Sequence, residues 1–380
     1  MHIEQIPLPP ISPNLPPATQ KLRQIVRDHY LDPTIKYLHK INVLKNVRSI
    51  ADISTTEIVA LGGGYMGASW WLDVPGEEIV LKFQRRGCDE EAEWLRVYRE
   101  HGVNVPEVKA VGEAPAQFFL GKPKNKIKFL AMEAVKGPNN KRAMTAREID
   151  ASLIPSKKIS ENMGSQLAKI LKCTSKKKFG NYNNTGEEDH VFSTWSEYLK
   201  TYLIPPHTKP FAVSDAKWIK VIRKLDMINF PDEGVYGHGD FSFHNVLVRT
   251  LDPLNIVIID PSLVIEDPYF DLSKQFSFDK LRQAKRAAFS EGGNYIAEWW
   301  EQSPIDIPSL LDAYFKAVGS TEIDLTRLQA NQLIYEIQAY NGRMEFLKGP
   351  RAPGHEKSIE SDLKVRRDSI KNIVQQLTDT

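Results

Sequence analysis

The sequence predicts an α+β protein in which an N-terminal antiparallel sheet with one inserted helix precedes a larger, mainly helical C-terminal part. Short apolar strands separated by turns fill residues 56–135, with a helical stretch at 89–101 after the third strand. Apolar residues then recur at helical spacing through most of residues 140–376. A pair of strands within 246–259 interrupts those helices. Strands followed by a run of helices are typical of the α+β class.

Length and composition place the chain among ordinary globular proteins. It has 380 residues and a formal net charge of +2, which argues against a nucleic-acid-binding protein. No run approaches the roughly 18 apolar residues of a membrane span, and the N-terminus lacks the basic and apolar regions of a signal peptide. Two cysteines, Cys88 and Cys173, are too few for a disulfide framework. We therefore expect a reducing, cytoplasmic setting.

The first 50 residues predict an extension before the sheet. Six prolines between residues 7 and 17 exclude a regular helix or a central strand, so we expect an extended arm there. Helical spacing across 18–47 predicts a helical segment that Pro33 interrupts. The expected domain division is 1–50 for the arm and helical extension, 51–137 for the sheet, and 138–380 for the helical part.

The first two strands bracket a glycine-rich turn. The strand 57–61 leads into Gly62, Gly64 and Gly67, and residues 69–74 form the returning strand. Glycine lets the backbone approach a phosphate closely and adopt positive φ, so this spacing is typical of a phosphate-binding loop. A plain hairpin turn is the alternative. A dinucleotide-binding loop requires a helix directly after the glycines, and the returning strand argues against it.

Lys82 lies alone in the apolar strand 79–83, where it either points to solvent or serves a function. The functional interpretation is a contact with the phosphates of ATP, with a helix glutamate holding the ammonium group in place. The next helix offers Glu90, Glu91 and Glu93 near its start. Periodicity does not choose between Glu90 and Glu91, because each shares a helix face with apolar residues.

The main candidate site is the segment from Gly237 to Val248, in which Asp240 and Asn245 precede a strand. The following strand, 256–259, ends directly on Asp260. This set suits phosphoryl transfer, in which one carboxylate takes the proton of an acceptor hydroxyl while an amide and a second carboxylate hold magnesium. We therefore predict Asp240 as the base and Asn245 and Asp260 as magnesium ligands. Residues that merely form turns are the alternative.

Neighbouring polar residues have structural interpretations as well. We expect His238 to shape the loop by hydrogen bonding, and Asp271 to cap its helix or to anchor the loop. Glu298, Glu336 and Glu345 in the C-terminal helices are candidate carboxylates for a cationic acceptor.

With these residues identified, the chain resembles the aminoglycoside phosphotransferase and choline kinase-like family, relatives of the protein kinases, over residues 55–345. The resemblance rests on His238-Gly239-Asp240 with Asn245, and on Ile259-Asp260-Pro261 with the helix start that follows. It implies a two-lobed protein-kinase-like fold, with the catalytic base and the magnesium ligands at the positions predicted above. Protein kinases carry Asp-Phe-Gly where this chain has Asp-Pro, but some antibiotic and sugar kinases of the group also carry Asp-Pro.

Two further segments extend the resemblance to nucleotide binding. The pattern from Glu91 to Pro106 is similar to the family's helix and following strand, and it selects Glu91 as the partner of Lys82. Met132-Glu133-Ala134-Val135-Lys136-Gly137 resembles the hinge. The resemblance implies that adenine bonds to backbone groups at Glu133 and Val135.

The implied activity is transfer of the γ-phosphate of ATP, with GTP as the alternative nucleotide, to a hydroxyl group in the presence of magnesium. The acceptor is expected to be a small molecule, namely an aminoglycoside or other antibiotic, an amino alcohol or a sugar. Neither nucleic acid nor membrane is an expected partner, and we expect a monomer or a homodimer. The alternative is a catalytically weak ATP-binding or scaffold protein with a kinase-like fold.

Overall fold

The computed structural model describes most of the chain, in fifteen stretches that carry every structural statement below. They are residues 21, 24–27, 29–54, 58–61, 67–74, 76–84, 87–114, 127–138, 142–146, 148–149, 154–182, 191–277, 306–319, 322–347 and 355–379. The proline-rich arm, Gly62, Gly64 and Glu298 lie outside these residues.

The chain forms two compact units, which are described separately. The first comprises Met1–Ala143, Tyr182–Gly186 and Val257–Ile259, and the second comprises Met144–Asn181, Glu187–Ile256 and Asp260–Thr380. No helix in the described part of either unit is both long enough and apolar enough to cross a membrane.

The first unit contains an antiparallel five-stranded sheet in the order β1-β2-β3-β5-β4. Its strands are β1 (Ile58–Ala60), β2 (Gly67–Leu72), β3 (Ile79–Gln84), β4 (Val108–Glu113) and β5 (Lys128–Glu133). A single helix, α3 (Cys88–Glu100), is inserted after β3. The predicted antiparallel sheet with one inserted helix is therefore confirmed.

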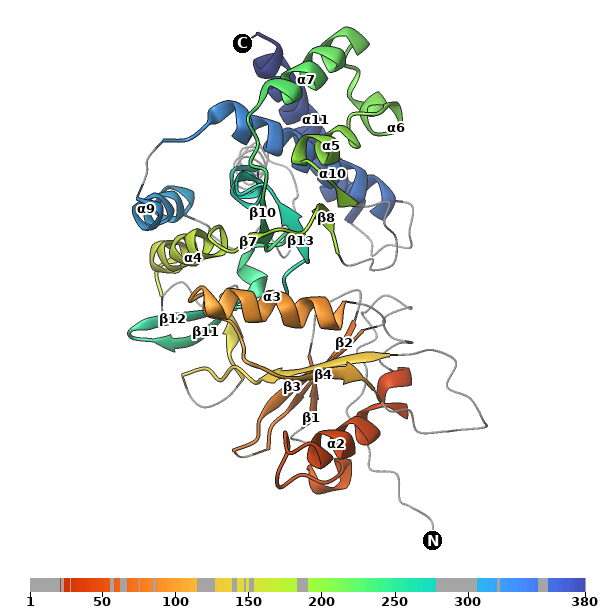
Figure 1. The fold of residues 1–380 in the computed structure, drawn as a ribbon, viewed down its shortest axis with the longest axis vertical. Helices are drawn as coiled ribbons and strands as arrows, with labels where there is room; N and C mark the ends of the chain where they lie inside the picture. Colours follow the sequence, from red (N-terminus) through yellow and green to blue (C-terminus); the bar gives the residue numbers. More distant parts are fainter. Residues whose placement is uncertain are drawn as a thin grey trace. The chain divides into compact units, whose positions relative to one another are not determined.

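Alternation along β3 decides which face of this sheet is the core. Ile79, Leu81 and Phe83 are buried, whereas the residues between them, including Lys82, are half-buried. The buried face packs against α2 (Leu31–Lys40) and the segment before it, whose apolar side chains belong to the same core. Figure 1 shows α2 and α3 on opposite sides of the sheet. The N-terminal extension thus adds a third layer to this unit.

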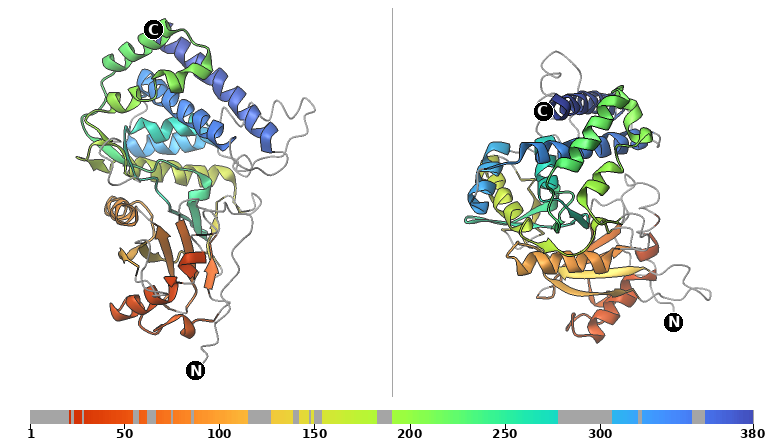
Figure 2. Two further views of the ribbon diagram at one scale, coloured as in Figure 1. Left: turned by 90° about the vertical axis from the view of Figure 1, so that its right-hand side faces the viewer. Right: turned by 45° about the horizontal axis from the view of Figure 1, so that its top comes forward.

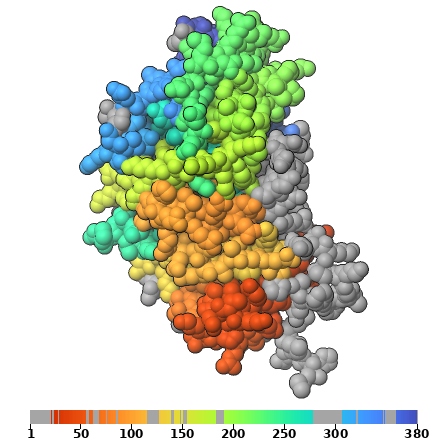
Figure 3. All heavy atoms as spheres, in the orientation of Figure 1, coloured from red at the N-terminus to blue at the C-terminus, as the bar shows by residue number. Residues whose placement is uncertain are grey.

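Pro33 stands just after a break in the helical run, because a turn at Tyr30 separates residue 29 from α2, so the predicted interruption is confirmed. It occupies the first turn of the helix, where a backbone N–H has no intrahelical partner and proline is tolerated. Leu31, Ile35 and Leu38 recur at helical spacing and are buried. The space-filling view shows the α2 segment, in red, on the surface of the first unit (Figure 3). One face of α2 therefore packs on the sheet while the other faces solvent.

Helices dominate the second unit, as predicted. They are α4 (Ser156–Ile170), α5 (Trp195–Lys200), α6 (Pro205–Thr208), α7 (Asp215–Met227), α9 (Ile307–Val318), α10 (Leu325–Phe346) and α11 (His355–Asp379), with another helix described over residues 269–277. Helix α4 packs against α9, and α10 packs against α11, which is drawn in the darkest blue in Figure 2. At the α4–α9 crossing a Cβ atom on Gly164 would overlap the carbonyl oxygen of Leu310.

The second unit also contains short strands, most of which the sequence did not predict. One sheet has the order β7-β10-β13-β8-β9 and the other has the order β12-β11-β6. The strands are β6 (Met144–Thr145), β7 (Thr174–Ser175), β8 (Phe179–Asn181), β9 (Val191–Phe192), β10 (Gly234–Gly237), β11 (Val246–Leu251), β12 (Leu254–Ile258) and β13 (Val264–Glu266). Only β11 and β12 match predicted strands. The others have two to four residues, too few to establish an alternating pattern.

Candidate functional site

The candidate site lies between the end of β10 and the start of β11, together with the residues that follow β12. Residues 237–245, which we call the Asp240 loop, connect β10 to β11. Strand β11 begins at Val246 and is the neighbour of β12, after which Asp260 follows. The hairpin β11–β12 therefore brings the end of the Asp240 loop and Asp260 to the same edge of the sheet, as predicted.

Asn245 is bound directly to Asp240. Its Nδ2 donates to the backbone oxygen of Asp240 at 2.8 Å and to the carboxylate Oδ2 of Asp240 at 2.9 Å. Asn245 is buried, whereas Asp240 is exposed. These contacts use both hydrogens of the amide, so its carbonyl oxygen Oδ1 is the atom that can bind a cation. The amide thus orients the candidate base and can also contribute a metal ligand.

Asp260 lies close enough to Asp240 to affect its ionisation. Burial raises the pKa of Asp240, because surrounding protein displaces water from the carboxyl group although the residue as a whole is exposed. His238, Asn245 and Lys274 lower this pKa, and the carboxylate of Asp260 raises it further. Two neighbouring carboxylates that repel each other are a suitable setting for a divalent cation.

Asp260 adopts positive φ, and the segment after it is bonded to the Asp240 loop. Its φ is 59°, a left-handed conformation that aspartate tolerates better than most residues. Two residues later, Ser262 donates its N–H to the carbonyl oxygen of His238 at 2.6 Å. Gly239 has a φ of 73°, and a Cβ atom there would lie 2.7 Å from Cβ of Ser262. Glycine at 239 therefore permits this close approach.

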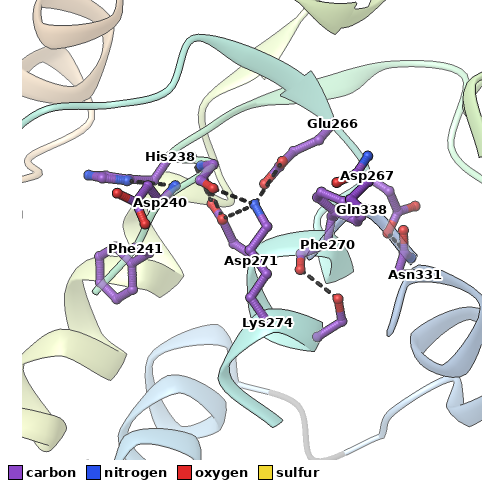
Figure 4. A network of polar contacts seen from close by, with 12 residues as sticks. His238, Asp240, Phe241, Glu266, Asp267, Phe270, Asp271, Lys274, Asn331 and Gln338 are labelled. Atoms are coloured by element: carbon purple, nitrogen blue, oxygen red, sulfur yellow. Dashed lines mark hydrogen bonds and ion pairs between the residues drawn. The ribbon is translucent and has the colours of Figure 1, made fainter. Parts of the chain in front are cut away.

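The helix that begins at residue 269 forms hydrogen bonds to the backbone of the Asp240 loop (Figure 4). The buried Asp271 accepts the N–H of His238 at 2.7 Å through Oδ2 and the N–H of Gly239 at 3.1 Å through Oδ1. Asp271 was expected either to cap its helix or to anchor the Asp240 loop, and these two bonds support the anchor. His238 places its Nδ1 3.3 Å from the N–H of Asp240, in line with its expected loop-shaping role.

A lysine and two carboxyl groups lie fully inside the protein next to this loop. Lys274 Nζ is 3.0 Å from Oδ1 of Asp271 and 3.7 Å from Oε2 of Glu266. Burial raises the pKa of Glu266 well above its ordinary value, and Asp271 adds to the rise. Burial acts in the same direction on Asp271, but the Lys274 ammonium, the hydrogen bond with Glu266 and His238 together outweigh it, and the pKa of Asp271 is lowered. We therefore expect Glu266 to carry a proton and Asp271 to be charged.

The replacement Glu266→Gln is expected to change how stability depends on pH. The folded-state pKa of Glu266 lies above its ordinary value of 4.5, so its contribution to stability is complete below that pH and is lost as pH rises toward the folded-state pKa. The variant lacks this loss, which amounts to about 1.4 kcal/mol per unit of pKa shift. Urea unfolding of both proteins at pH 5 and pH 8 measures the effect.

Glu345→Gln is the matched control for this measurement, because Glu345 is an exposed glutamate on α10. The free energy of unfolding of Glu266→Gln should rise relative to wild type between pH 5 and pH 8, while that of Glu345→Gln should not. Equal differences at the two pH values would show that Glu266 does not retain its proton in the folded state.

In the first unit, Lys82 forms an ion pair with Glu91. Lys82 Nζ lies 2.7 Å from Oε2 and 3.0 Å from Oε1 of Glu91, and Gln84 Nε2 donates to the same Oε2 at 3.0 Å. The side chains of Lys82 and Glu91 are only 14% and 4% exposed. The structure therefore selects Glu91 among the three candidate glutamates. Gly67 is the first residue of β2 and pairs with Gln84, while the other two loop glycines lie outside the described residues.

The predicted hinge residues lie at and just after the end of β5. The N–H of Glu133 donates to the carbonyl oxygen of Glu107 at 2.8 Å, and the carbonyl oxygen of Val135 accepts from the N–H of Ala143 at 3.0 Å. Adenine contacts at these residues would therefore use neither the Glu133 N–H nor the Val135 carbonyl.

Sequence reasoning missed Lys274 and Gln275, which contact the Asp240 loop. Lys274 Nζ donates to the carbonyl oxygen of Gly239 at 2.8 Å, and Gln275 Nε2 donates to that of Phe241 at 2.7 Å. Both residues follow Asp271 at helical spacing, three and four positions later. That spacing is the signal that would have placed them on the same helix face as the anchor.

Of the candidate carboxylates of the C-terminal helices, the structure describes Glu336 and Glu345, and they have different surroundings. Glu336 is buried and pairs with Arg366, whose Nη1 lies 2.7 Å from Oε2 of Glu336. Glu345 is exposed near the end of α10. Across the described stretches, no three side chains of His, Cys, Asp or Glu come together as a metal cluster. The oxygens of Asp260 and Asn245 instead match the small donor set that Mg²⁺ uses with phosphates and water.

Comparisons with known proteins agree with this geometry. The pattern of the phosphotransferase enzyme family matches residues 57–299 of the chain. No curated protein matches the chain. The fold is similar to that of the aminoglycoside phosphotransferase APH(4)-Ia, at 14% identity over 84% of this chain and 93% of that chain, with a TM-score of 0.50.

Two further solved structures share the fold. A thermostable mutant of APH(4)-Ia in a ternary complex with AMP-PNP and hygromycin B is 15% identical over 84% of this chain and 93% of that chain, with a TM-score of 0.50. The microcompartment-associated aminopropanol kinase is 13% identical over 86% of this chain and 95% of that chain, with a TM-score of 0.52. At these identities the likeness establishes the fold, and it confirms the predicted α+β, protein-kinase-like class.

Proposed function

Because the chain belongs to the phosphotransferase enzyme family, whose pattern covers residues 57–299, we propose that it transfers the γ-phosphate of ATP to a hydroxyl group of a small molecule. The observation that carries this proposal is the bond from Asn245 Nδ2 to Oδ2 of Asp240, beside the carboxylate of Asp260. One loop thus supplies an oriented carboxylate next to two oxygen donors for a metal. This is the donor set that phosphoryl transfer requires.

In this proposal, Asp240 accepts the proton of the acceptor hydroxyl as its oxygen attacks the γ-phosphorus atom. The bond from Asn245 holds the carboxylate in one orientation, and Asp240 is an exposed residue that an acceptor can reach. The oxygens of Asn245 and Asp260 would hold Mg²⁺, which neutralises phosphate charge when it is bound. The proton ends on Asp240 and the phosphoryl group on the acceptor, with ADP as the leaving group.

Nucleotide binding is assigned to the first unit. We propose that Lys82, fixed by Glu91, contacts the phosphates, and that Gly62, Gly64 and Gly67 form the loop that covers them. Backbone groups of Glu133 and Val135 are assigned to adenine. The AMP-PNP complex of the related fold supports ATP as the nucleotide. Competition of GTP with ATP in a binding assay decides between the two.

The variant Lys82→Met is expected to weaken ATP binding by about 10- to 100-fold, because a hydrogen bond to a charged group contributes about 1.5–3 kcal/mol. It also leaves Glu91 buried without its cation, which is expected to cost about 3–5 kcal/mol of stability. Titration calorimetry with ATP and urea unfolding measure the two effects.

The double variant Lys82→Met/Glu91→Gln separates these effects. The glutamine keeps an acceptor for Gln84 and removes the unpaired charge, so stability should recover while ATP binding stays weak. Recovery of ATP binding together with stability would show that Lys82 serves only to pair with Glu91.

The acceptor class requires a direct test. The fold is shared by an aminoglycoside phosphotransferase and an aminopropanol kinase, which differ in the acceptors their names indicate. Glu336 forms a buried ion pair with Arg366, so its carboxylate is not placed to bind a polycationic acceptor. Mixed amide and carboxylate linings suit a sugar, whereas several carboxylates suit an aminoglycoside.

An ADP-release assay with a panel of aminoglycosides, other antibiotics, amino alcohols and sugars tests the proposal. At least one acceptor should accelerate ADP release from Mg·ATP, and mass spectrometry should find it heavier by one phosphoryl group. Binding of ATP without release of ADP across the whole panel would favour the alternative, a kinase-fold scaffold protein.

A further inference from the structure

We propose that Lys274 and Gln275 are positioning residues for Asp240, because their side chains fix the peptide carbonyls on either side of it. This inference rests on the proposed function, in which Asp240 is the base. Neither residue touches the Asp240 side chain through a hydrogen bond in the described structure. Gln275 would act only through the backbone that carries Asp240, whereas the charge of Lys274 also lowers the pKa of Asp240.

Lys274 fixes the orientation of the peptide bond that precedes Asp240. Its Nζ donates to the carbonyl oxygen of Gly239 at 2.8 Å, and that carbonyl belongs to the peptide linking Gly239 to Asp240. Gly239 has a φ of 73° and no side chain to restrict its backbone. A fixed hydrogen bond at this carbonyl therefore sets the plane from which the Asp240 side chain departs.

Gln275 controls the backbone on the other side of Asp240. Its Nε2 donates to the carbonyl oxygen of Phe241 at 2.7 Å, and the glutamine is fully buried. Asp271 on the same helix holds the N–H groups of His238 and Gly239. A single helix thus forms hydrogen bonds to the loop before and after Asp240, which is itself an exposed residue.

The cost of burying Lys274 argues that its contact with the loop matters. Its side chain is only 5% exposed, and it lies between the carboxyls of Asp271 and Glu266 and 4.5 Å from the ring centre of Phe270. Apolar residues in place of a buried ion pair are often neutral or stabilising. The ion pair is therefore weak evidence for a role in stability alone, and the same ammonium group also binds the Gly239 carbonyl, where it fixes the peptide that carries the base. Figure 4 shows the ammonium group directed at this loop.

Two variants test the role. Lys274→Met combined with Glu266→Gln removes the donor and fixes residue 266 in an uncharged form, while Asp271 loses its cation and keeps only its backbone N–H donors. Gln275→Met removes the second donor at similar volume and changes no charge. Ser273→Ala is the matched control, because Ser273 is buried in the same helix and donates only to the carbonyl oxygen of Phe270, at 2.7 Å, among the contacts of the described structure.

The turnover number should be measured by ADP release from Mg·ATP with the most active acceptor of the panel, per nucleotide-binding site counted by titration. We expect both positioning variants to lose about 10- to 100-fold in kcat, since a small misplacement of a catalytic group has effects of this size. The KM for the acceptor and the Kd for Mg·ATP should stay within about twofold of wild type. Ser273→Ala should keep the wild-type kcat.

An unchanged kcat in Gln275→Met and in the double variant would overturn the inference. So would a parallel loss in KM, Kd and kcat, or an equal loss in Ser273→Ala, because either indicates general disorder of the helix. If the double variant does not fold, the uncharged Gln275→Met decides the question. A wild-type protein that releases no ADP with any acceptor contradicts the proposed function instead, so the two failures are distinguishable.

Discussion

Replacing Asp240 with asparagine is expected to lower the turnover number by about 100- to 10,000-fold, the usual contribution of a general base. Asparagine has nearly the same shape, and its side-chain oxygen can still accept the bond from Nδ2 of Asn245. What the variant loses is the ability to take the proton of the acceptor hydroxyl. The nucleotide contacts assigned to Lys82 and Glu91 do not involve this side chain, so the Kd for ATP should change little.

The measurement combines ADP release with ATP titration on the same protein preparations. Asp232→Asn is a suitable control, because Asp232 is an exposed aspartate shortly before β10 and the substitution makes the same change in formal charge. Loss of turnover in Asp240→Asn and not in Asp232→Asn supports the assigned base. Turnover retained in Asp240→Asn would exclude it.

The variant Gly164→Ala is expected to destabilise the protein by at least about 2 kcal/mol, whatever the function. A Cβ atom at this position would overlap the backbone carbonyl of Leu310, where α4 crosses α9. Backbone cannot rotate away as a flexible side chain can, so the two helices must separate. This cost outweighs the roughly 1 kcal/mol that alanine normally gains over glycine inside a helix. Urea unfolding gives the free energy directly.

Gly342→Ala provides the opposite expectation and serves as the control. Gly342 lies within α10, and a Cβ atom there would meet nothing within 4 Å. Alanine should therefore stabilise the protein by up to about 1 kcal/mol through helix propensity. If both variants shift stability in the same direction, close backbone approach is not what requires glycine at the α4–α9 crossing.

Much of the fold followed from local sequence patterns. Strands β2 to β5, α3, and the principal helices of the second unit each contain enough residues to show their period, whereas the short β1 was predicted from its place before the glycine-rich turn. The phosphotransferase class and the fold class are confirmed by the family and by the shared fold. The two- to four-residue strands of the second unit were missed, because so few residues carry no period. The break near Pro33 was predicted correctly, because proline is tolerated in the first turn of a helix and not in its interior.

The candidate site could be predicted where its residues are near one another in the chain. Asp240 and Asn245 are five positions apart, and the loop between them brings the amide onto the carboxylate. The roles of these residues stay predictions until the variants are measured. The partner of Lys82 was ambiguous from periodicity, since several glutamates occupy one helix start and only the packing of α3 on the sheet selects Glu91.

By itself, the sequence determined which chemical groups are present, in what order, and which stretches form helices or strands, because these depend on neighbours along the chain. Only the tertiary structure decided that α2 packs on the sheet and that Lys274 and Gln275 hold the Asp240 loop. Lys274 is 35 positions from Gly239, the residue whose carbonyl it binds. Contacts over such separations depend on how elements pack, which no local period encodes.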